Sequence, residues 1–418
     1  MVRLEIKILV SLLGALLLSG CGESQPPPDL FALPVSYMVG KKPEVVLARD
    51  MNNDEFPDIL VVNSAGNSLT YLEGIGDGTF KSPETIETGR EPFALDVADF
   101  NGDRIPDIAL CNYGDGNVSI ILGQKDGLFK LKTEVKVGRL PIAIAAGDFN
   151  NDEIIDLAVT LRFDKLIILL GVGDGTFKVA EAYQAGPTPA NLTIDDFNSD
   201  GNQDIAMALN AVKVRHIKMF LGNGDGTFQP PKKISGGRQS SFIIHHDMNL
   251  DGKTDLIASS PMKDSLSIYM GDGKGAFLKL DDFAGEKGPH NIVVGDFTGD
   301  KVPDIVVCNR RGGTISVIPG RGDGSFVYPH YNYVVGSQPR SITGADFNHD
   351  GMMDIAVVLY QKQILEIFIR KMNSPPIDAK LFAQSYSSGS GLSSSPPMIY
   401  LPSGSALISR AAPFATNG

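Results

Sequence analysis

Short apolar runs separated by polar turns follow one another through most of the chain. Some of these runs start directly after an aspartate, as in DIALC, DLAVT and DIVVC, and others follow shortly afterwards, as in VSIILG and LIILLG. Both kinds are apolar with almost no polar alternation, which is typical of short strands with two buried faces. GDG turns and a G-x-x-P segment separate the runs. The pattern therefore predicts units of four short β-strands.

An acidic motif of nine residues recurs in step with the apolar runs. Its pattern is D-x-N-x-D-x-x-x-D, and it first occurs in DMNNDEFPD, residues 50–58. There are seven copies in total, at intervals of 48 to 51 residues, and all keep Asp at positions one, five and nine, whereas Thr298 replaces one Asn at position three. The copies begin at Asp50, Asp99, Asp148, Asp196, Asp247, Asp296 and Asp346. A fixed period of this length is the signature of a repeat architecture.

Other residues keep the same phase as the acidic motif. A Gly precedes the motif by ten residues in six copies, and a Pro precedes it by seven residues in six copies. The prolines are Pro43, Pro92, Pro141, Pro189, Pro289 and Pro339. Four-stranded units of this length that stack face to face are propeller blades, of which known propellers have roughly 4–8. We therefore expect an all-β, seven-bladed β-propeller of four-stranded antiparallel blades over residues 31–371.

The start of the propeller region supplies a piece that its end lacks. The seventh unit has three apolar runs, the last ending near residues 364–370, but neither a GDG turn nor a fourth run. FALPVSYMVGKKP, residues 31–43, matches FKSPETIETGREP, residues 80–92. We therefore expect residues 31–39 to add the outer strand of the last blade, which would close the ring and remove an unpaired edge.

The two ends of the chain predict export and flexible segments. Residues 1–20 combine a charged start, a short apolar run and small residues, as a signal peptide does. The segment LLSGC resembles a bacterial lipobox, which implies a lipid on Cys21 and a cell-envelope location, at the outer membrane in a Gram-negative host because Gly22 follows. An ordinary signal peptide is the alternative. Residues 21–30 are expected to be a tether and residues 372–418, rich in Ser, Gly and Pro, a flexible tail.

Composition narrows the possible partners. The 418 residues carry a net charge of −12, which argues against nucleic acid as a partner. Besides Cys21 there are only Cys111 and Cys308, too few for a disulfide scaffold. They stand at the same place in two units that lie three blades apart in the expected ring, so we expect buried free thiols.

The phased copies resemble FG-GAP repeats, also called VCBS-type repeats, which occur in the integrin α-subunit head and in many bacterial surface proteins. The resemblance extends over about residues 30–371 and implies a seven-bladed propeller whose acidic loops bind calcium. It also implies that ligands bind to the face opposite these loops.

The residues of the acidic motif themselves favour calcium. Oxygen groups at alternating positions of a tight loop can converge on one point, and calcium accepts six to eight oxygens in irregular geometry. Asx-type turns without metal are the alternative. Thr298 makes the loop at Asp296 the weakest site. The predicted ligands, with position seven contributing its carbonyl, are Asp50, Asn52, Asp54, Phe56, Asp58, Asp99, Asn101, Asp103, Ile105, Asp107, Asp148, Asn150, Asp152, Ile154, Asp156, Asp196, Asn198, Asp200, Asn202, Asp204, Asp247, Asn249, Asp251, Lys253, Asp255, Asp296, Thr298, Asp300, Val302, Asp304, Asp346, Asn348, Asp350, Met352 and Asp354.

The expected face opposite the acidic loops is rich in basic residues. These basic residues are Lys41, Lys42, Arg90, Arg139, Arg162, Lys165, Lys213, Arg215, Arg238, Lys263, Lys287, Arg310, Arg311 and Lys362. The acidic residues on this face are Glu91, Asp115, Asp164, Asp264 and Glu286. Such an excess predicts either a platform for an acidic glycan or an acidic protein, or a solvated rim that aids solubility.

Three functional classes stay open. The first is a calcium-stabilised binding or adhesion propeller at the cell envelope, with a protein or an acidic glycan as its partner. The second is a carbohydrate-active enzyme, such as a polysaccharide lyase, and the third is a structural subunit of an envelope complex. The sequence contains neither G-x-S-x-G nor H-E-x-x-H, and no catalytic residue is assigned. We interpret Arg321–Asp323, an RGD tripeptide, as part of a repeat turn.

Overall fold

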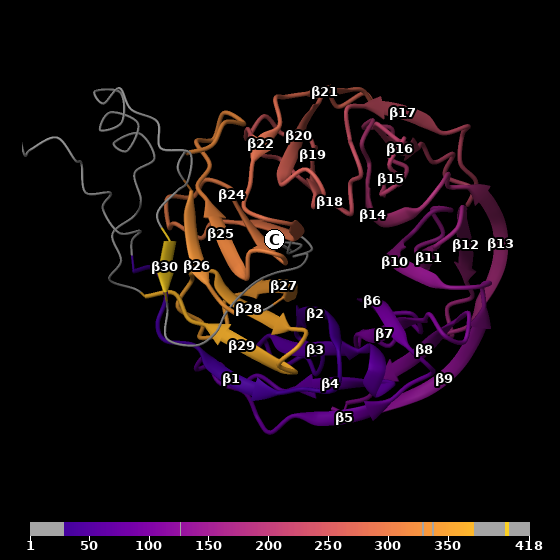
Figure 1. The fold of residues 1–418 in the computed structure, drawn as a ribbon. Helices are drawn as coiled ribbons and strands as arrows, with labels where there is room; N and C mark the ends of the chain where they lie inside the picture. The colour runs from indigo at the N-terminus through magenta and orange to yellow at the C-terminus, as the bar shows by residue number, and fades with distance from the viewer. Residues whose placement is uncertain (1–28, 126, 328–329, 337, 372–397, 401–418) are drawn as a thin grey trace, which may run out of the picture.

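A computed structural model of the chain shows an all-β ring of seven blades (Figure 1). Residues of the first strands of all seven blades line a central cavity, the channel. The structure describes residues 29–371, except 126, 328–329 and 337, together with residues 398–400. The predicted signal peptide, the lipidated Cys21 and most of the predicted tether and tail lie outside these residues. No helix in the part of the chain that is described is long and apolar enough to cross a membrane.

The first four blades each contain four consecutive antiparallel strands. Blade one contains β2 (Pro43–Arg49), β3 (Asp58–Asn63), β4 (Ser68–Leu72) and β5 (Glu84–Glu87), with the short 3₁₀ helix η1 (Ser64–Gly66) between β3 and β4. Blade two contains β6 (Pro92–Ala98), β7 (Asp107–Asn112), β8 (Asn117–Gly123) and β9 (Phe129–Lys136). Blade three contains β10 (Pro141–Gly147), β11 (Asp156–Leu161), β12 (Lys165–Gly171) and β13 (Phe177–Gln184). Blade four contains β14 (Pro189–Asp195), β15 (Asp204–Leu209), β16 (His216–Phe220) and β17 (Lys232–Ser235).

The last three blades follow the same plan with small additions. Blade five contains β18 (Phe242–His246), β19 (Asp255–Ser260), β20 (Ser265–Gly271) and β21 (Phe277–Lys279), and β22 (Phe283–Ala284) also pairs with β20. Blade six contains β23 (Pro289–Gly295), β24 (Asp304–Asn309), β25 (Thr314–Ile318) and β26 (Tyr331–Val334), with β30 (Met398–Tyr400) paired in parallel to β26. Blade seven contains β27 (Pro339–Ala345), β28 (Asp354–Leu359), β29 (Ile364–Phe368) and β1 (Val35–Met38).

The N-terminal strand β1 completes blade seven. It pairs antiparallel with β29, from Val35 opposite Ile367 to Met38 opposite Ile364. Blade seven is therefore built from both ends of the propeller region, so the ring is closed and β29 has no unpaired edge. The predicted seven-bladed antiparallel propeller is confirmed.

The hydrophobic core is divided among the interfaces between neighbouring blades. Seven clusters of buried apolar side chains each join two adjacent blades. Between blades one and two, for example, Leu60 of β3 clusters with Leu95 of β6 and Ile108 of β7. The second strand of every blade is fully buried along its length, as β7 and β11 show, because both of its faces pack against neighbouring blades. Cys111 and Cys308 are buried free thiols within these clusters, as predicted.

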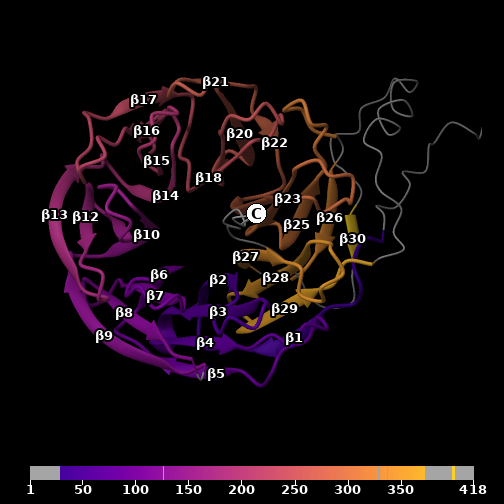
Figure 2. The same cartoon turned by 180° about the vertical axis from the view of Figure 1, so that it is seen from behind.

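The blades are oriented so that their first strands surround the channel. Both views place β2, β6, β10, β14, β18 and β27 nearest the centre and β5, β9 and β13 at the rim, and Figure 2 also shows β23 near the centre (Figures 1 and 2). Six of the seven first strands begin at the repeat Pro, and all seven lead into an acidic loop, as β2 does from Pro43 to Arg49. The two mouths of the channel are therefore chemically distinct: one carries the prolines and the other carries the acidic loops.

Candidate functional site

The acidic loops are organised by the aspartate at position one. In blade one, Asp50 Oδ1 accepts hydrogen bonds from the backbone N–H of Asn52 at 3.3 Å and of Asp54 at 3.2 Å, and its Oδ2 accepts one from Glu55 at 2.9 Å. The Asn52 side-chain oxygen accepts from the same Asp54 N–H at 3.0 Å. Because one N–H reaches both oxygens, the side-chain oxygens of positions one and three lie close together. These are Asx-type turns of the kind expected for this motif.

The aspartate at position nine has a structural role that the sequence did not reveal. Asp156 is fully buried; its Oδ2 accepts from the N–H of Phe149 at 3.0 Å and its Oδ1 from the N–H of Gly171 at 2.8 Å. The same two bonds recur in every blade, joining the start of the loop to the end of the third strand. The sequence signal for these bonds was the Gly that ends the third apolar run in six copies, because its N–H is one of the two donors.

Burial changes the acidity of these closing aspartates. It raises the pKa of Asp58, Asp107 and Asp156 from 3.8 to about 6, although the backbone N–H bonds act in the opposite direction. For Asp204 and Asp354 burial raises the pKa to about 7, and the neighbouring carboxylates of their loops add to the increase. Without a nearby positive charge, the buried carboxylates therefore resist ionisation.

Position six of every acidic loop adopts the left-handed backbone conformation. Gly201 has a φ of 86° there, which glycine adopts at little cost, whereas Glu55 (74°), Arg104 (67°) and Glu153 (65°) carry a Cβ atom. The same sharp turn is thus present in all seven loops. In four of them it is made by a residue that is strained in this conformation.

The loop of blade six differs from the other six. The N–H of Thr298 donates to the closing carboxylate of Asp304 at 2.8 Å rather than to Asp296, and the Thr298 side chain is fully buried, with no hydrogen-bond partner for its Oγ1 among the described residues. Arg370, only 2% exposed, donates from Nη2 to the Thr298 carbonyl at 2.6 Å. The buried guanidinium of Arg370 therefore lies against this loop.

The predicted calcium ligands stay a prediction. Each set is brought together within a single loop, because all its members come from nine consecutive residues. In the described part of the chain, however, no three His, Cys, Asp or Glu side chains are grouped closely enough to hold a metal ion as they stand.

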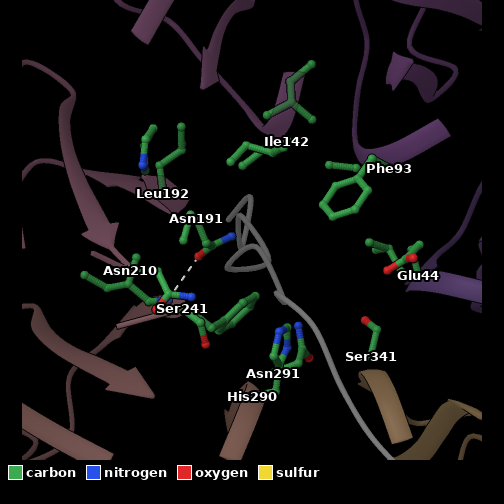
Figure 3. Close-up of a pocket in the computed structure, with 18 of the residues that line it drawn as sticks. Glu44, Phe93, Ile142, Asn191, Leu192, Asn210, Ser241, His290, Asn291 and Ser341 are labelled. Carbon is green, nitrogen blue, oxygen red and sulfur yellow. Dashed lines mark hydrogen bonds between the residues drawn. The ribbon is translucent and has the colours of Figure 1, made fainter. Parts of the chain in front are cut away.

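The mouth on the proline side opens into a cavity of about 460 Å³ (Figure 3). One residue from each blade lines it at the equivalent position, directly after the repeat Pro in six blades and directly before β18 in blade five. These residues are Glu44, Phe93, Ile142, Ala190, Ser241, His290 and Arg340, and Phe242 lines the cavity next to Ser241. In each blade with the Pro, the register of the first strand shifts directly after it. Such a bulge re-aims a side chain, here into the channel.

The ring of lining residues is divided into two arcs. Blades two to five contribute the apolar arc, which we define as Phe93, Ile142, Ala190 and Phe242; all four are partly exposed. Blades six, seven and one contribute His290, Arg340 and Glu44. Together with Arg310, from the loop that follows β24, these three residues form the charged arc. The mouth therefore has His290, Arg310 and the Arg340–Glu44 pair on one side and its large apolar side chains on the other, where Asp96, Arg162 and Asn191 also line it.

Within the charged arc, one arginine is paired and the other is not. Arg340 Nε donates to Glu44 Oε2 at 2.5 Å, and both side chains are mostly buried, with 13% and 8% exposed. Arg310 has no carboxylate within ion-pair distance in the described chain, and its guanidinium lies 5.9 Å from the ring centre of Tyr360. Burial and the adjacent Arg340 lower the pKa of Arg310, yet a guanidinium stays charged at neutral pH. A partly buried, unpaired positive charge therefore faces the cavity.

His290 completes the polar wall as a neutral group. Burial, together with the charges of Arg340 and Arg310, lowers its pKa well below 6.5. Its Nδ1 atom is buried and has no hydrogen-bond partner among the described residues. Figure 3 shows His290 beside Asn291 and near Ser241 on one wall of the mouth. At neutral pH this ring can donate or accept a hydrogen bond without adding charge.

A second cavity, of about 860 Å³, shares a wall with the first. Asn210, Ser241, His290 and Arg310 line both. Beyond this wall the second cavity is lined by loops of blades five to seven, including Met262, whose side chain is 61% exposed. The mouth thus continues outward over one sector of the ring.

The basic residues predicted for this face have different placements. Arg162 and Arg310 line the mouth, whereas Arg90 and Arg311 form ion pairs with Asp115 and Asp264. The sequence reasoning missed Glu44, His290 and Arg340. A usable signal was the residue after the repeat Pro, whose phase is as fixed as that of the acidic motif.

Comparisons with known proteins agree with this architecture. The profile of the FG-GAP-like repeat matches residues 50–110, 99–159, 148–207, 247–307 and 298–357. Among solved structures, BBS1N in complex with ARL6DN has a TM-score of 0.60 at 13% identity, covering 83% of this chain and 98% of that one. Kuenenia stuttgartiensis hydrazine synthase has a TM-score of 0.56 at 14% identity, covering 84% and 99%. Both likenesses concern the fold alone.

Comparison with curated protein sequences gives no significant match. The repeat profile matches more than half of the chain and coincides with the phased acidic loops of the observed blades. The chain therefore belongs to the family of proteins with FG-GAP-like repeats.

Proposed function

We propose that this propeller is a binding module that takes an anionic group of its partner at the proline-side mouth of the channel. The observation that carries the proposal is the Arg310 guanidinium, which faces the cavity with no carboxylate partner in the described chain. Arg340 and Arg162 line the same cavity. A partly desolvated arginine gains most from a carboxylate, sulfate or phosphate that it can hold in two hydrogen bonds.

The cavity lining favours binding over catalysis. Among the described residues that line the first cavity there is one histidine, His290, but neither a tyrosine nor a lysine. A lyase needs a base beside its substrate, and the neutral His290 has no charged or hydroxyl partner in the described chain that would orient it. We also propose that the protein is exported, lipid-anchored and binds or adheres at the cell envelope. This part of the proposal rests on the sequence of residues 1–21.

The test is salt-dependent binding of the purified protein to acidic partners. Retention on immobilised oligogalacturonate and on immobilised oligoglutamate would be measured at about 50 mM and 500 mM salt, because charge-driven binding weakens as screening increases. We expect retention on at least one matrix at low salt and its loss at high salt. Retention on neither matrix at low salt would refute the proposal and leave the basic residues as a solvated rim.

We further propose that calcium stabilises the acidic loops of six blades. The donor set fits: in blades one to five and seven, three carboxylates and an amide stand at alternating positions, and the oxygens of positions one and three approach the same N–H, as Asp346 and Asn348 approach Asp350 at 3.0 and 3.2 Å. When bound, calcium would supply the positive charge that these carboxylates lack.

The loop of blade six does not fit calcium equally well. The hydroxyl of Thr298 is buried, and its backbone is turned toward Asp304. The negative charges of Asp296 and Asp304 act on the buried Arg370 guanidinium, which is already in place. Calcium bound to the whole protein would be counted by native mass spectrometry. Six ions are expected, whereas seven would contradict the exclusion of this loop and none would refute calcium binding.

A further inference from the structure

We infer that the partner's contact point is a short polypeptide segment in which an acidic group stands next to an apolar side chain. This inference rests on the proposed function and names the ligand class of the same site. It follows from the division of the mouth into an apolar arc and a charged arc, which no property of the repeat itself requires.

The charged arc is suited to a single carboxylate. Lys42, Arg310 and Arg340 approach the Tyr360 ring, at 6.0, 5.9 and 5.9 Å from its centre, and Glu44 is the one carboxylate paired among them. Glu44 holds Arg340 in place, so Arg310 is the cation left to bind a ligand. Cations that gather around one aromatic ring beside a cavity repel one another, and an incoming anion would relieve that repulsion.

The apolar arc adds a requirement that a purely charged ligand would not meet. Phe93, Ile142 and Phe242 are partly exposed at the mouth, from blades on the other side of the channel. Covering partly exposed apolar side chains is favourable by about 25 cal/mol per Å² of apolar surface. The best ligand therefore carries an apolar group within reach of its acidic group, since the two arcs border one cavity of about 460 Å³.

The shared wall of the two cavities favours an extended occupant. Asn210 and Ser241 line both cavities, as do His290 and Arg310. Amide and hydroxyl groups along such a wall can pair with the alternating N–H and C=O groups of a peptide backbone. The segment would run outward from the mouth toward the exposed side chain of Met262.

A glycan fits this lining less well than a peptide. A saccharide presents hydroxyl groups on most of its edges, and burying a hydroxyl without a hydrogen-bond partner is costly. Phe93, Ile142, Ala190 and Phe242 offer no side-chain donor or acceptor, so a saccharide on this side could pair only with neighbours such as Asn191 and Ser241. An aliphatic or aromatic side chain of a peptide has no such requirement.

The experiment is a selection of random heptapeptides displayed on phage against the immobilised full-length protein at low salt. Enriched peptides would be synthesised, and their affinities would be measured by fluorescence anisotropy against the wild type and three variants: Arg310→Gln, Phe93→Ala and Arg139→Gln. Arg139 is exposed on the same face but does not line either cavity, so it serves as the matched charge control.

We expect enriched peptides to carry Asp or Glu within two residues of an aromatic or aliphatic residue. Arg310→Gln should weaken their binding about tenfold or more, since a charged hydrogen-bonded pair is lost. Phe93→Ala should also weaken it, whereas Arg139→Gln should change it less than twofold.

Enrichment of peptides without an acid, or without an apolar residue, would overturn the inference. So would the absence of any enrichment while oligogalacturonate still binds in an Arg310-dependent manner; in that case the proposed anion site stands and its ligand is a glycan. If neither peptides nor oligogalacturonate binds, the proposed function fails together with the inference.

Discussion

The ion pair between Arg340 and Glu44 should contribute more to stability than any exposed pair of this protein. Both side chains are mostly buried, with 13% and 8% exposed, and their charged atoms are 2.5 Å apart. Replacing Arg340 by Met leaves the Glu44 carboxylate buried beside Ser64, whose Oγ lies 3.3 Å from Oε1. Breaking a buried pair in this way costs about 3–5 kcal/mol. Because the Ser64 bond survives, we expect the lower end, about 3 kcal/mol.

The assay is a double-mutant cycle in urea. The free energy of unfolding would be measured for the wild type, Arg340→Met, Glu44→Gln and the double variant, and a parallel cycle would be made on Arg90 and Asp115. In that control pair the side chains are 72% and 22% exposed, so solvent screens their charges and a much smaller coupling is expected. The double variant at the mouth should recover much of the loss, since no charge is left buried. Equal coupling in the two cycles would refute the assignment of Arg340 as the paired arginine and Arg310 as the available one.

The remaining predictions concern the acidic loops. Removing calcium with a chelator should lower the melting temperature, and an unchanged melting curve by circular dichroism would contradict calcium binding. In calcium-free protein, the free energy of unfolding should rise as the pH falls from about 7 toward 5. Burial raises the pKa of closing aspartates such as Asp107 and Asp354 to about 6 and 7 in the folded state, against 3.8 when unfolded. The folded state therefore binds more protons than the unfolded state between these pH values. Saturating calcium should flatten or reverse this trend, since the ion competes with protons; the same slope with and without calcium would count against the account. Glu153→Gly should stabilise the protein by about 0.5–1 kcal/mol in urea, because Glu153 has a φ of 65° that glycine adopts without strain, while Gly201→Ala at the equivalent position of blade four should destabilise it.

The ring could be predicted from the sequence because its determinants are local. Each acidic motif, GDG turn and repeat Pro specifies a turn within its own blade, and the apolar runs between them specify strands with two buried faces. At position six, Gly201 adopts the sharp turn without strain, and Glu55 adopts the same conformation because the rest of its loop imposes it.

The chemistry of the mouth could not be predicted in the same way. The residue after the repeat Pro faces the channel only because the strand bulges there, and a bulge is visible in the hydrogen-bond register rather than in composition. The contact of Arg370 with Thr298 joins residues that are 72 positions apart, so no local pattern marks it. The two hydrogen bonds that Asp156 accepts could not be predicted either, because one donor is Gly171 at the end of the third strand, outside the motif.

The most direct test of the account is to locate the backbone amides that an anionic partner protects from hydrogen exchange. Hydrogen–deuterium exchange would be followed by mass spectrometry on the full-length protein, with and without saturating oligoglutamate. The account predicts slower exchange in peptides that contain His290, Arg310 and Arg340, with no change in the acidic loops at the opposite mouth. Protection confined to the acidic loops or to the outer strands, with the proline-side mouth unchanged, would contradict it.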